Sequence, residues 1–247
     1  MLRGIYTASA GMVAQMRRQQ SVANNLANAA TNGYKQDTST ITSFPSLRLW
    51  RTGSQPAAVG SLGTGVLATG SPLDLAQGPL KETGRALDLA LGGRGFFAVR
   101  TADGDYYTRA GSLQLRADGV LANQDGAPVL GEQGPITLPD EDVVIQPDGT
   151  VYAGGVRVDR LLVVDAPTPN ALGKVGDNLL TCTAGAMQPV PAGETRLVQG
   201  CLEESNVDGA AAMVEAMAAM RAYEAAQRAL QMQDSTLARA IDEVGKA

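Results

Sequence analysis

The sequence predicts an α+β fold in which a mainly antiparallel β domain lies between an N-terminal and a C-terminal helix. Small and apolar residues recur with a helical period at both ends of the chain, whereas Asp-Gly pairs separate short strand-like runs in the middle. These observations divide the 247 residues into a helix over 1–36, an extended connector over 37–75, a β domain over 76–204 and a second helix over 205–247.

The N-terminal helix is predicted from a seam of residues spaced by alternating fours and threes, which places them on one face of a helix. The seam consists of Ile5, Ser9, Met12, Met16, Gln19, Ala23 and Leu26. It mixes Met, Ala and polar side chains, so it is a weak core stripe. Gly33 supplies a stop signal, because glycine accepts the left-handed conformation that ends many helices.

The connector follows neither a helical nor a strand period. It is rich in Ser, Thr, Gly and Pro, and it holds the only tryptophan, Trp50. This composition predicts an extended segment with little helix.

The β domain is predicted from its turns, because Gly accepts φ > 0 and an Asp-Gly pair therefore makes a tight hairpin turn. The pairs are Asp103-Gly104, Asp118-Gly119, Asp125-Gly126 and Asp148-Gly149. The strand-like runs lie at 96–99, 106–108, 112–116, 143–145 and 161–164.

The C-terminal helix is predicted from an uninterrupted stretch without Gly or Pro, from Ala210 to Val244. Ser205, Asn206 and Asp208 precede it as candidate N-cap residues. Its seam consists of Ala216, Met220, Tyr223, Gln227, Leu230, Asp234, Leu237 and Ile241. At ~1.5 Å per residue the helix is about 50 Å long, which is more than one small domain covers. The spacing therefore favours a coiled-coil-like surface for a partner.

Three methionines of this helix, Met213, Met217 and Met220, can be interpreted in two ways. They form either a hydrophobic surface that adapts to irregular contacts or an inward helix face. Both interpretations require a surface that covers the methionines, and the β domain offers the seam no obvious partner, so they lead to the same expectation of a partner outside this domain.

Charge and length exclude two classes of partner. The net charge is −5 and no Lys/Arg run exceeds the pair Arg17-Arg18, so the basic footprint of a nucleic-acid-binding protein is missing. No apolar stretch reaches the roughly 20 residues of a membrane-spanning helix, so we expect no direct lipid insertion. The N-terminus lacks the pattern of a conventional secretory signal, which taken alone indicates the cytoplasm.

The sequence gives no indication of an enzyme. It contains no histidine, which removes the common nucleophile systems and His-containing metal sites. The glycine-rich segment 60–65 does not have the order of a dinucleotide fingerprint, and the acidic run 140–142 is typical of a solvated turn. We therefore expect no catalytic residue, cofactor or metal. Cys182 and Cys201 form either one disulfide or two partly buried thiols, of which we favour the thiols.

Five blocks of the chain carry a resemblance to a known family. Residues 23–35 read ANNLANAATNGYK, and the other blocks are RALDLALGGRGFF at 85–97, YTRAGS at 107–112, QGCLEESNV at 199–207 and RAYE at 221–224. Together they resemble the flagellar rod and hook protein family, in the family's order and over nearly the whole chain. Leu113 stands where the family more often has an aromatic residue.

The resemblance gives the first block a physical interpretation. Asn24, Asn25 and Asn28 can hydrogen-bond to backbone or to other subunits near a helix end. Gly33 permits a reversal of the chain before Tyr34 starts the connector.

The resemblance implies a tubular assembly. The terminal helices would pair into a coiled-coil-like axial layer, with the β domain outside it. The implied partners are other copies, neighbouring rod and hook axial proteins, and the flagellar type III export apparatus. The implied location is the basal-body rod that spans the cell envelope, reached without a cleaved signal peptide.

Within the family, the modest length, the single β domain and the segment 131–139 (GEQGPITLP) favour the proximal rod proteins. The alternative is a distal rod protein, which the segment 63–66 resembles, or another axial protein of the hook and basal body. A hypothesis of a different class is a monomeric ligand-binding β module with helical appendages, which would need a concave aromatic site.

Overall fold

The computed structural model describes residues 2–52, 57–70, 72–139, 142–166, 168, 171–183, 185, 187–191 and 193–245. Two residues of the acidic run, Asp140 and Glu141, lie outside this part of the chain. The chain divides into two compact units, each assembled from separated segments. Unit 1 comprises Met1–Ala27, Asp37–Pro72 and Asp208–Ala247, and unit 2 comprises Asn28–Gln36 and Leu73–Val207.

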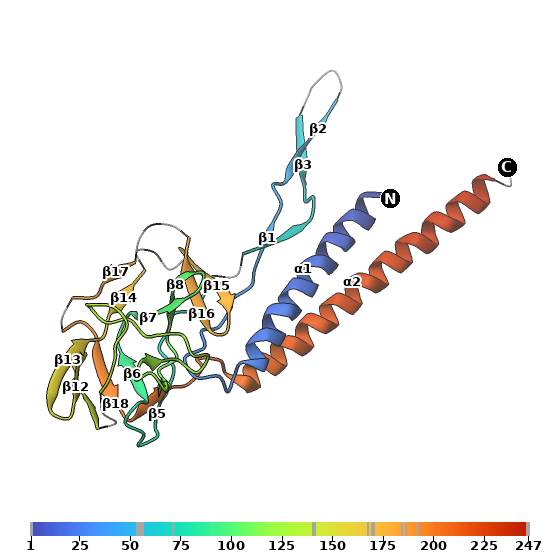
Figure 1. The fold of residues 1–247 in the computed structure, drawn as a ribbon. Helices are drawn as coiled ribbons and strands as arrows, with labels where there is room; N and C mark the ends of the chain where they lie inside the picture. The colour runs from blue at the N-terminus through green and yellow to red at the C-terminus, as the bar shows by residue number, and fades with distance from the viewer. Residues whose placement is uncertain are drawn as a thin grey trace. The chain divides into compact units, whose positions relative to one another are not determined.

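Unit 1 contains the two long helices, α1 (Leu2–Ala27) and α2 (Gly209–Val244), which pack side by side and run in opposite directions (Figure 1). Gly4 of α1 lies against the side chain of Gln233 of α2. Farther along, Arg18 Nη2 lies 2.8 Å from Glu215 Oε1. The prediction of terminal helices on either side of a mainly antiparallel β region is confirmed.

The covered face of α2 keeps the predicted spacing but uses smaller side chains. Its less exposed positions include Ala212, Ala216, Ala219, Tyr223, Ala226, Leu230, Gln233 and Leu237. In the predicted seam, by contrast, every second position is exposed, namely Met220, Gln227, Asp234 and Ile241. Helices approach closely where side chains are small, so alanines occupy the contact while the methionines lie outside it. The predicted seam therefore combines positions of the covered face, such as Tyr223 and Leu230, with exposed positions such as Met220.

The segment 40–69, which lies within the expected connector, forms a two-stranded antiparallel ribbon. Strand β1 (Thr40–Ser43) pairs with β4 (Val66–Thr69), and β2 (Leu47–Arg51) pairs with β3 (Ala57–Leu62). A register shift occurs between Leu49 and Trp50. Arg17 of α1 donates from Nη1 to the carbonyl of Ala68 at 3.2 Å, so the ribbon also contacts the helix.

Unit 2 is a set of short antiparallel strands. They are β5 (Leu80–Glu82), β6 (Leu89–Gly92), β7 (Phe96–Thr101), β8 (Gly104–Thr108), β9 (Gln114–Leu115), β10 (Leu121–Ala122), β11 (Val143–Ile145), β12 (Thr150–Ala153), β13 (Val156–Arg160), β14 (Val163–Asp165), β15 (Leu172–Gly176), β16 (Leu179–Cys182), β17 (Gln188–Pro189), β18 (Arg196–Gln199) and β19 (Cys201–Glu203). Six of them form a sheet in the order β15-β16-β8-β7-β14-β17, and β11-β12-β13 form a second sheet. The main core contains Leu89, Phe97, Val99, Leu121 and Val151, all without solvent exposure.

The Asp-Gly turns lie where they were predicted. Gly104 is the first residue of β8, directly after the turn that follows β7, while Gly119 lies between β9 and β10 and Gly149 lies between β11 and β12. Each has φ between +79° and +136°, a conformation that strains any residue with a side chain. Local chemistry therefore determines these hairpins.

Three further properties concern the described residues only. Neither helix combines the length and the hydropathy that a membrane span needs. No group of three or more Cys, Asp or Glu side chains is arranged to hold a metal ion. Cys182 and Cys201 are half-buried thiols that form no disulfide.

Candidate assembly site

Two short segments of unit 2 connect its β strands to the ends of the chain. We call residues 28–36 the N-terminal strap and residues 203–207 the C-terminal strap. Gly33 donates its N–H to the carbonyl of Glu203 at 2.7 Å, and Gln36 donates its N–H to Oδ1 of Asn206 at 2.8 Å. The Nδ2 of Asn206 donates to the carbonyl of Asp74 at 2.9 Å. The straps are thus bound to each other although they are about 170 positions apart in sequence.

A buried ion cluster lies beneath the straps. Glu203 accepts from Lys35 Nζ at 2.5 Å and from Arg109 Nη1 at 3.1 Å, and the Gly78 N–H donates to it at 3.0 Å. The three charged side chains are at most 4% exposed. Lys35 also donates to the Ala76 carbonyl at 2.7 Å. The cluster joins the two straps to the loop that follows β8, so each of three resemblance blocks contributes one charge.

Burial sets the electrostatics of the cluster. It lowers the pKa of Lys35 from the ordinary value of 10.5, while the hydrogen bond and charge of Glu203 act in the opposite direction. Burial also lowers the pKa of Arg109, again against the effect of Glu203. The guanidinium of Arg109 lies over the Phe96 ring, 5.3 Å from its centroid. Removing the shared carboxylate of Glu203 would therefore leave two buried cations without a counterion and without access to water.

Two glycines of the resemblance blocks allow the backbone to pass close to its neighbours. Gly33 has φ +71°, and a Cβ there would lie 2.4 Å from the backbone of Arg109 and Ala110. A Cβ at Gly111 would lie 1.6 Å from the carbonyl oxygen of Leu89. These distances exclude any side chain, which explains why the pattern needs glycine at both places.

The other residues predicted from the first block lie in both units. Asn25, 2% exposed, accepts from the N–H of Asp37 and donates to its carbonyl, each at 2.9 Å, within unit 1. Asn24 donates to the Asp37 carboxylate at 3.3 Å. In unit 2, Asn28 accepts from the hydroxyl of Thr31, and the buried Tyr34 ring lies 3.8 Å from Lys174 Nζ. Leu26, near the end of α1, is half-buried.

The predicted stop of the first helix needs correction, and of the three N-cap candidates of the second helix only Asp208 is confirmed. Helix α1 ends at Ala27, six positions before the predicted stop at Gly33, because the strap leaves the helix through turns. The N-cap of α2 is Asp208, whose Oδ1 accepts from the N–H groups of Ala210 and Ala211. Asn206 bonds to the N-terminal strap instead, and the Ser205 hydroxyl accepts from the N–H of Val207.

The predicted α2 residues fall on two faces. Tyr223, Leu230 and Leu237 are half-buried. Met213 and Met220 are 55% and 53% exposed. The second group therefore forms an outward apolar surface on unit 1.

Sequence reasoning missed the ion cluster. Lys35, Arg109 and Glu203 lie in the resemblance blocks, but no ion pair among them was predicted: Lys35 was expected to start the connector, and Glu203 to belong to the capping groups before the second helix. The available signal was that Lys35 and Arg109 are the single charged residues of their blocks and that the third block carries the pair Glu203-Glu204 beside apolar residues. Nothing in one sequence shows that residues so far apart meet.

Comparisons with known proteins agree with the blocks. A family model described as flagella basal body rod protein matches residues 5–35. The flagellar hook protein FlgE/F/G D1 domain matches 90–153, and the flagellar basal body rod FlgEFG protein C-terminal matches 198–243.

Curated relatives match along nearly their whole length. The flagellar basal-body rod protein FlgF of Caulobacter vibrioides is 32% identical, with 98% of each chain covered. FlgF of Escherichia coli is 35% identical, with 96% of each covered. The flagellar basal-body rod protein FlgG of Borreliella burgdorferi is 32% identical, with 96% of this chain and 97% of the relative covered. The chain therefore belongs to the family of flagellar basal-body rod proteins.

Proposed function

We propose that this chain is a structural subunit of the flagellar basal-body rod, that it polymerises through its terminal helices, and that it catalyses no reaction. The observation that carries the proposal is the outward face of α2, considered together with the family. Met213, Met217 and Met220 follow one another at helical spacing and are each more than half exposed. A soluble monomer rarely leaves a contiguous apolar stripe uncovered, and Met adapts to irregular contacts.

The covered and uncovered faces of α2 support an arrangement in which each helix pair contacts the helices of the next copy. In one copy, the alanine-rich face packs against α1. The methionine face is then available for a helix of the next copy, and Tyr6 of α1, 73% exposed, offers a second apolar position. Spacing by alternating fours and threes is what a coiled-coil-like axial layer requires. Asn24, Tyr223, Leu230 and Leu237 support this layer by holding the shape of unit 1.

The proposed location and partners follow from the relatives, whose names place them in the flagellar basal body. We place the chain in the rod that spans the cell envelope, in contact with other copies and with neighbouring rod and hook axial proteins. Delivery would use the flagellar type III export apparatus, without a cleaved signal peptide. Both FlgF and FlgG proteins match at similar identity, so the proximal rod, FlgF-like position rests on length and on the segment 131–139, with the distal rod as the alternative.

The monomeric ligand-binding module has less support. It needs a concave site lined by aromatic side chains. The groove around Tyr106 on unit 2 has that single aromatic ring in its lining.

The test is deletion of the gene in the source bacterium, followed by electron microscopy of purified basal bodies. We expect truncated rods without hook or filament, which the intact gene restores. A strain that builds complete flagella after the deletion would contradict the rod role.

Point variants test the helix surfaces separately. Met220→Asp should block rod assembly while leaving the thermal unfolding of the purified chain unchanged, because its side chain is exposed. Leu230→Asp should block assembly and also lower the unfolding temperature, because its side chain is half-buried. Ala225→Asp, an exposed position on a face of α2 that carries neither the methionine stripe nor the contact with α1, is the control and should assemble. Normal rods from Met220→Asp would refute the assigned surface.

A further inference from the structure

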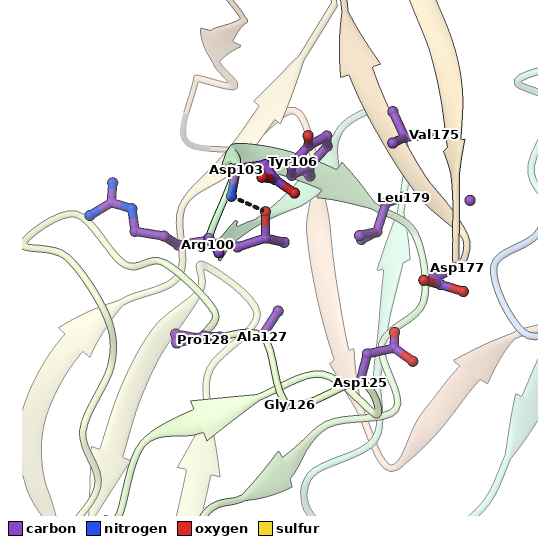
Figure 2. Close-up of a pocket in the computed structure, with 13 residues that line it drawn as sticks. Arg100, Asp103, Tyr106, Asp125, Gly126, Ala127, Pro128, Val175, Asp177 and Leu179 are labelled. Carbon is purple, nitrogen blue, oxygen red and sulfur yellow. Dashed lines mark hydrogen bonds between the residues drawn. The ribbon is translucent and has the colours of Figure 1, made fainter.

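An open groove lies on unit 2 among three turns. Its lining comes from the β7–β8 turn (100–103), the turn 125–128 and the β15–β16 turn (175–179), with Tyr106 between them. Figure 2 shows Asp103 and Tyr106 on one side, Val175 and Leu179 on the next, and the turn 125–128 across from them. The groove has a volume of about 600 Å³, within the range of about 300–1,000 Å³ typical of sites that hold a bound group.

The groove combines an apolar lining with an acidic rim. Tyr106 and Leu179 are half-buried and Val175 is 55% exposed, so the groove presents apolar surface to solvent. Asp103, Asp125 and Asp177, all exposed, add three carboxylates.

Arg100, the cation among the lining residues, already forms an ion pair with a neighbouring carboxylate. Arg100 donates to the carboxylate of Asp105 at 2.8 Å and 3.2 Å. The Arg100 hydrogen bond lowers the pKa of that carboxyl group below its ordinary value. The groove is therefore suited to a partner that carries both an apolar group and a positive charge.

The β2–β3 ribbon of unit 1 carries the complementary chemistry. Between residues 38 and 73 the sequence contains no Asp or Glu, and its two charged residues are Arg48 and Arg51. The chain as a whole has a net charge of −5, so this basic segment is a local exception.

Strand β2 presents its side chains to solvent along its whole length. Arg48 and Trp50 are two positions apart on β2, roughly 7 Å along the strand, with the register shift between Leu49 and Trp50 lying between them. Trp50 is 60% exposed. Tryptophan and arginine are the residue types that most often dominate the energy of protein interfaces.

We infer that the β2 strand of one copy docks into this groove on a second copy, with Trp50 against Tyr106, Val175 and Leu179 and with Arg48 facing the carboxylates of Asp103 and its neighbours. The occupant is a second copy because charge and apolar complementarity both lie within this one sequence. The contact requires copies to lie side by side, so it rests on the proposed rod role. It adds a link between unit 1 of one subunit and unit 2 of another, separate from any contact of the helices.

Photo-crosslinking in assembled rods tests the contact directly. The photoreactive p-benzoylphenylalanine replaces Trp50, which keeps an aromatic ring at that position. We expect a crosslinked dimer of this chain whose second copy is modified within 100–106, 125–128 or 175–179. The same probe at Val156, 68% exposed on β13, is the control and should not modify the groove. A crosslink within one chain, to a different protein or to another part of the second copy would overturn the inference.

A charge exchange tests the assigned partners. Arg48→Asp and Asp103→Arg should each lower the dimer yield about tenfold, which corresponds to about 1.4 kcal/mol. The double variant should restore the yield, because the two charges are exchanged. Asp118→Arg is the matched control, because Asp118 also precedes the Gly of an Asp-Gly turn but lies outside the groove. This variant should not lower the dimer yield, and it should not restore the yield of Arg48→Asp.

The outcomes separate this contact from the rod role. Complete rods with an unchanged dimer yield from Arg48→Asp would refute the contact and leave the rod role intact. A gene deletion without effect on the rod would instead refute the rod role.

Discussion

The substitution Glu203→Gln tests the role of the buried ion cluster. It preserves the size of the side chain and removes the charge that Lys35 and Arg109 share. Both cations stay buried, with side chains 2% and 4% exposed. Removing one partner of a buried ion pair costs about 3–5 kcal/mol, because the remaining charge has no counterion. Lys35 can relieve part of this cost by losing its proton, since burial already lowers its pKa.

We therefore expect Glu203→Gln to lower the free energy of unfolding of unit 2 by about 3–5 kcal/mol. In a domain of this size each 1 kcal/mol shifts Tm by about 2–4 °C, so Tm should fall by about 6–20 °C. The assay is thermal unfolding of the full chain, followed by the near-ultraviolet circular dichroism of tyrosine. Unit 1 holds the only tryptophan, so its fluorescence reports on the ribbon separately.

The neighbouring residue provides the control. Glu204 is 43% exposed and lies 3.4 Å from the exposed Lys81, so Glu204→Gln should cost at most about 1 kcal/mol. The double variant Lys35→Met/Glu203→Gln should recover part of the loss, because one stranded cation is gone. Equal Tm values for Glu203→Gln and Glu204→Gln would refute the reasoning.

Three further predictions concern unit 2 and the start of α2. Gly33→Ala should destabilise unit 2 by more than about 3 kcal/mol in urea unfolding, because the new Cβ clashes with backbone atoms and the left-handed conformation adds about 1–2 kcal/mol. Gly126→Ala is the control, since Gly126 has φ +81° but open space around it. This variant should lose only the roughly 1–2 kcal/mol of the left-handed conformation. Asp208→Ala removes the α2 N-cap and should cost about 1 kcal/mol, measured by helix unfolding at 222 nm; no change would show that the cap is dispensable. Lys35 has a lowered pKa in the folded chain, so at pH values between that pKa and 10.5 the unfolded chain binds more protons than the folded chain. The free energy of unfolding of the wild type should therefore rise with pH in this window when it is compared with that of Lys35→Met. A decrease would contradict the burial of a charged Lys35.

The sequence predicted those parts of the structure that local chemistry determines. Helix α2 was expected from Ala210 to Val244 and extends over Gly209–Val244, because the stretch lacks helix breakers. The Asp-Gly hairpins were likewise expected, since Gly104, Gly119 and Gly149 need only their own φ.

What the sequence could not predict depends on distant contacts. The face of α2 that packs on α1 is set by the small side chains that fit between the helices, and hydrophobic spacing alone does not distinguish Ala219 from Met220. The pairing of β1 with β4 was missed because its composition is that of a loop. The ion cluster joins Lys35 to Glu203 across 168 positions, and no local pattern indicates such a pair.

The same separation has a consequence for the order of folding. Lys35 belongs to the early part of the chain and Glu203 to its last fifth, so a chain delivered from its N-terminus holds Lys35 and Arg109 without their counterion until almost all of it has emerged. Burying either cation before then costs several kcal/mol, and closing so long a loop costs entropy as well. A chain without its last fifth therefore gains little from early closure of unit 2, and the addition of the C-terminal strap makes the compact state favourable.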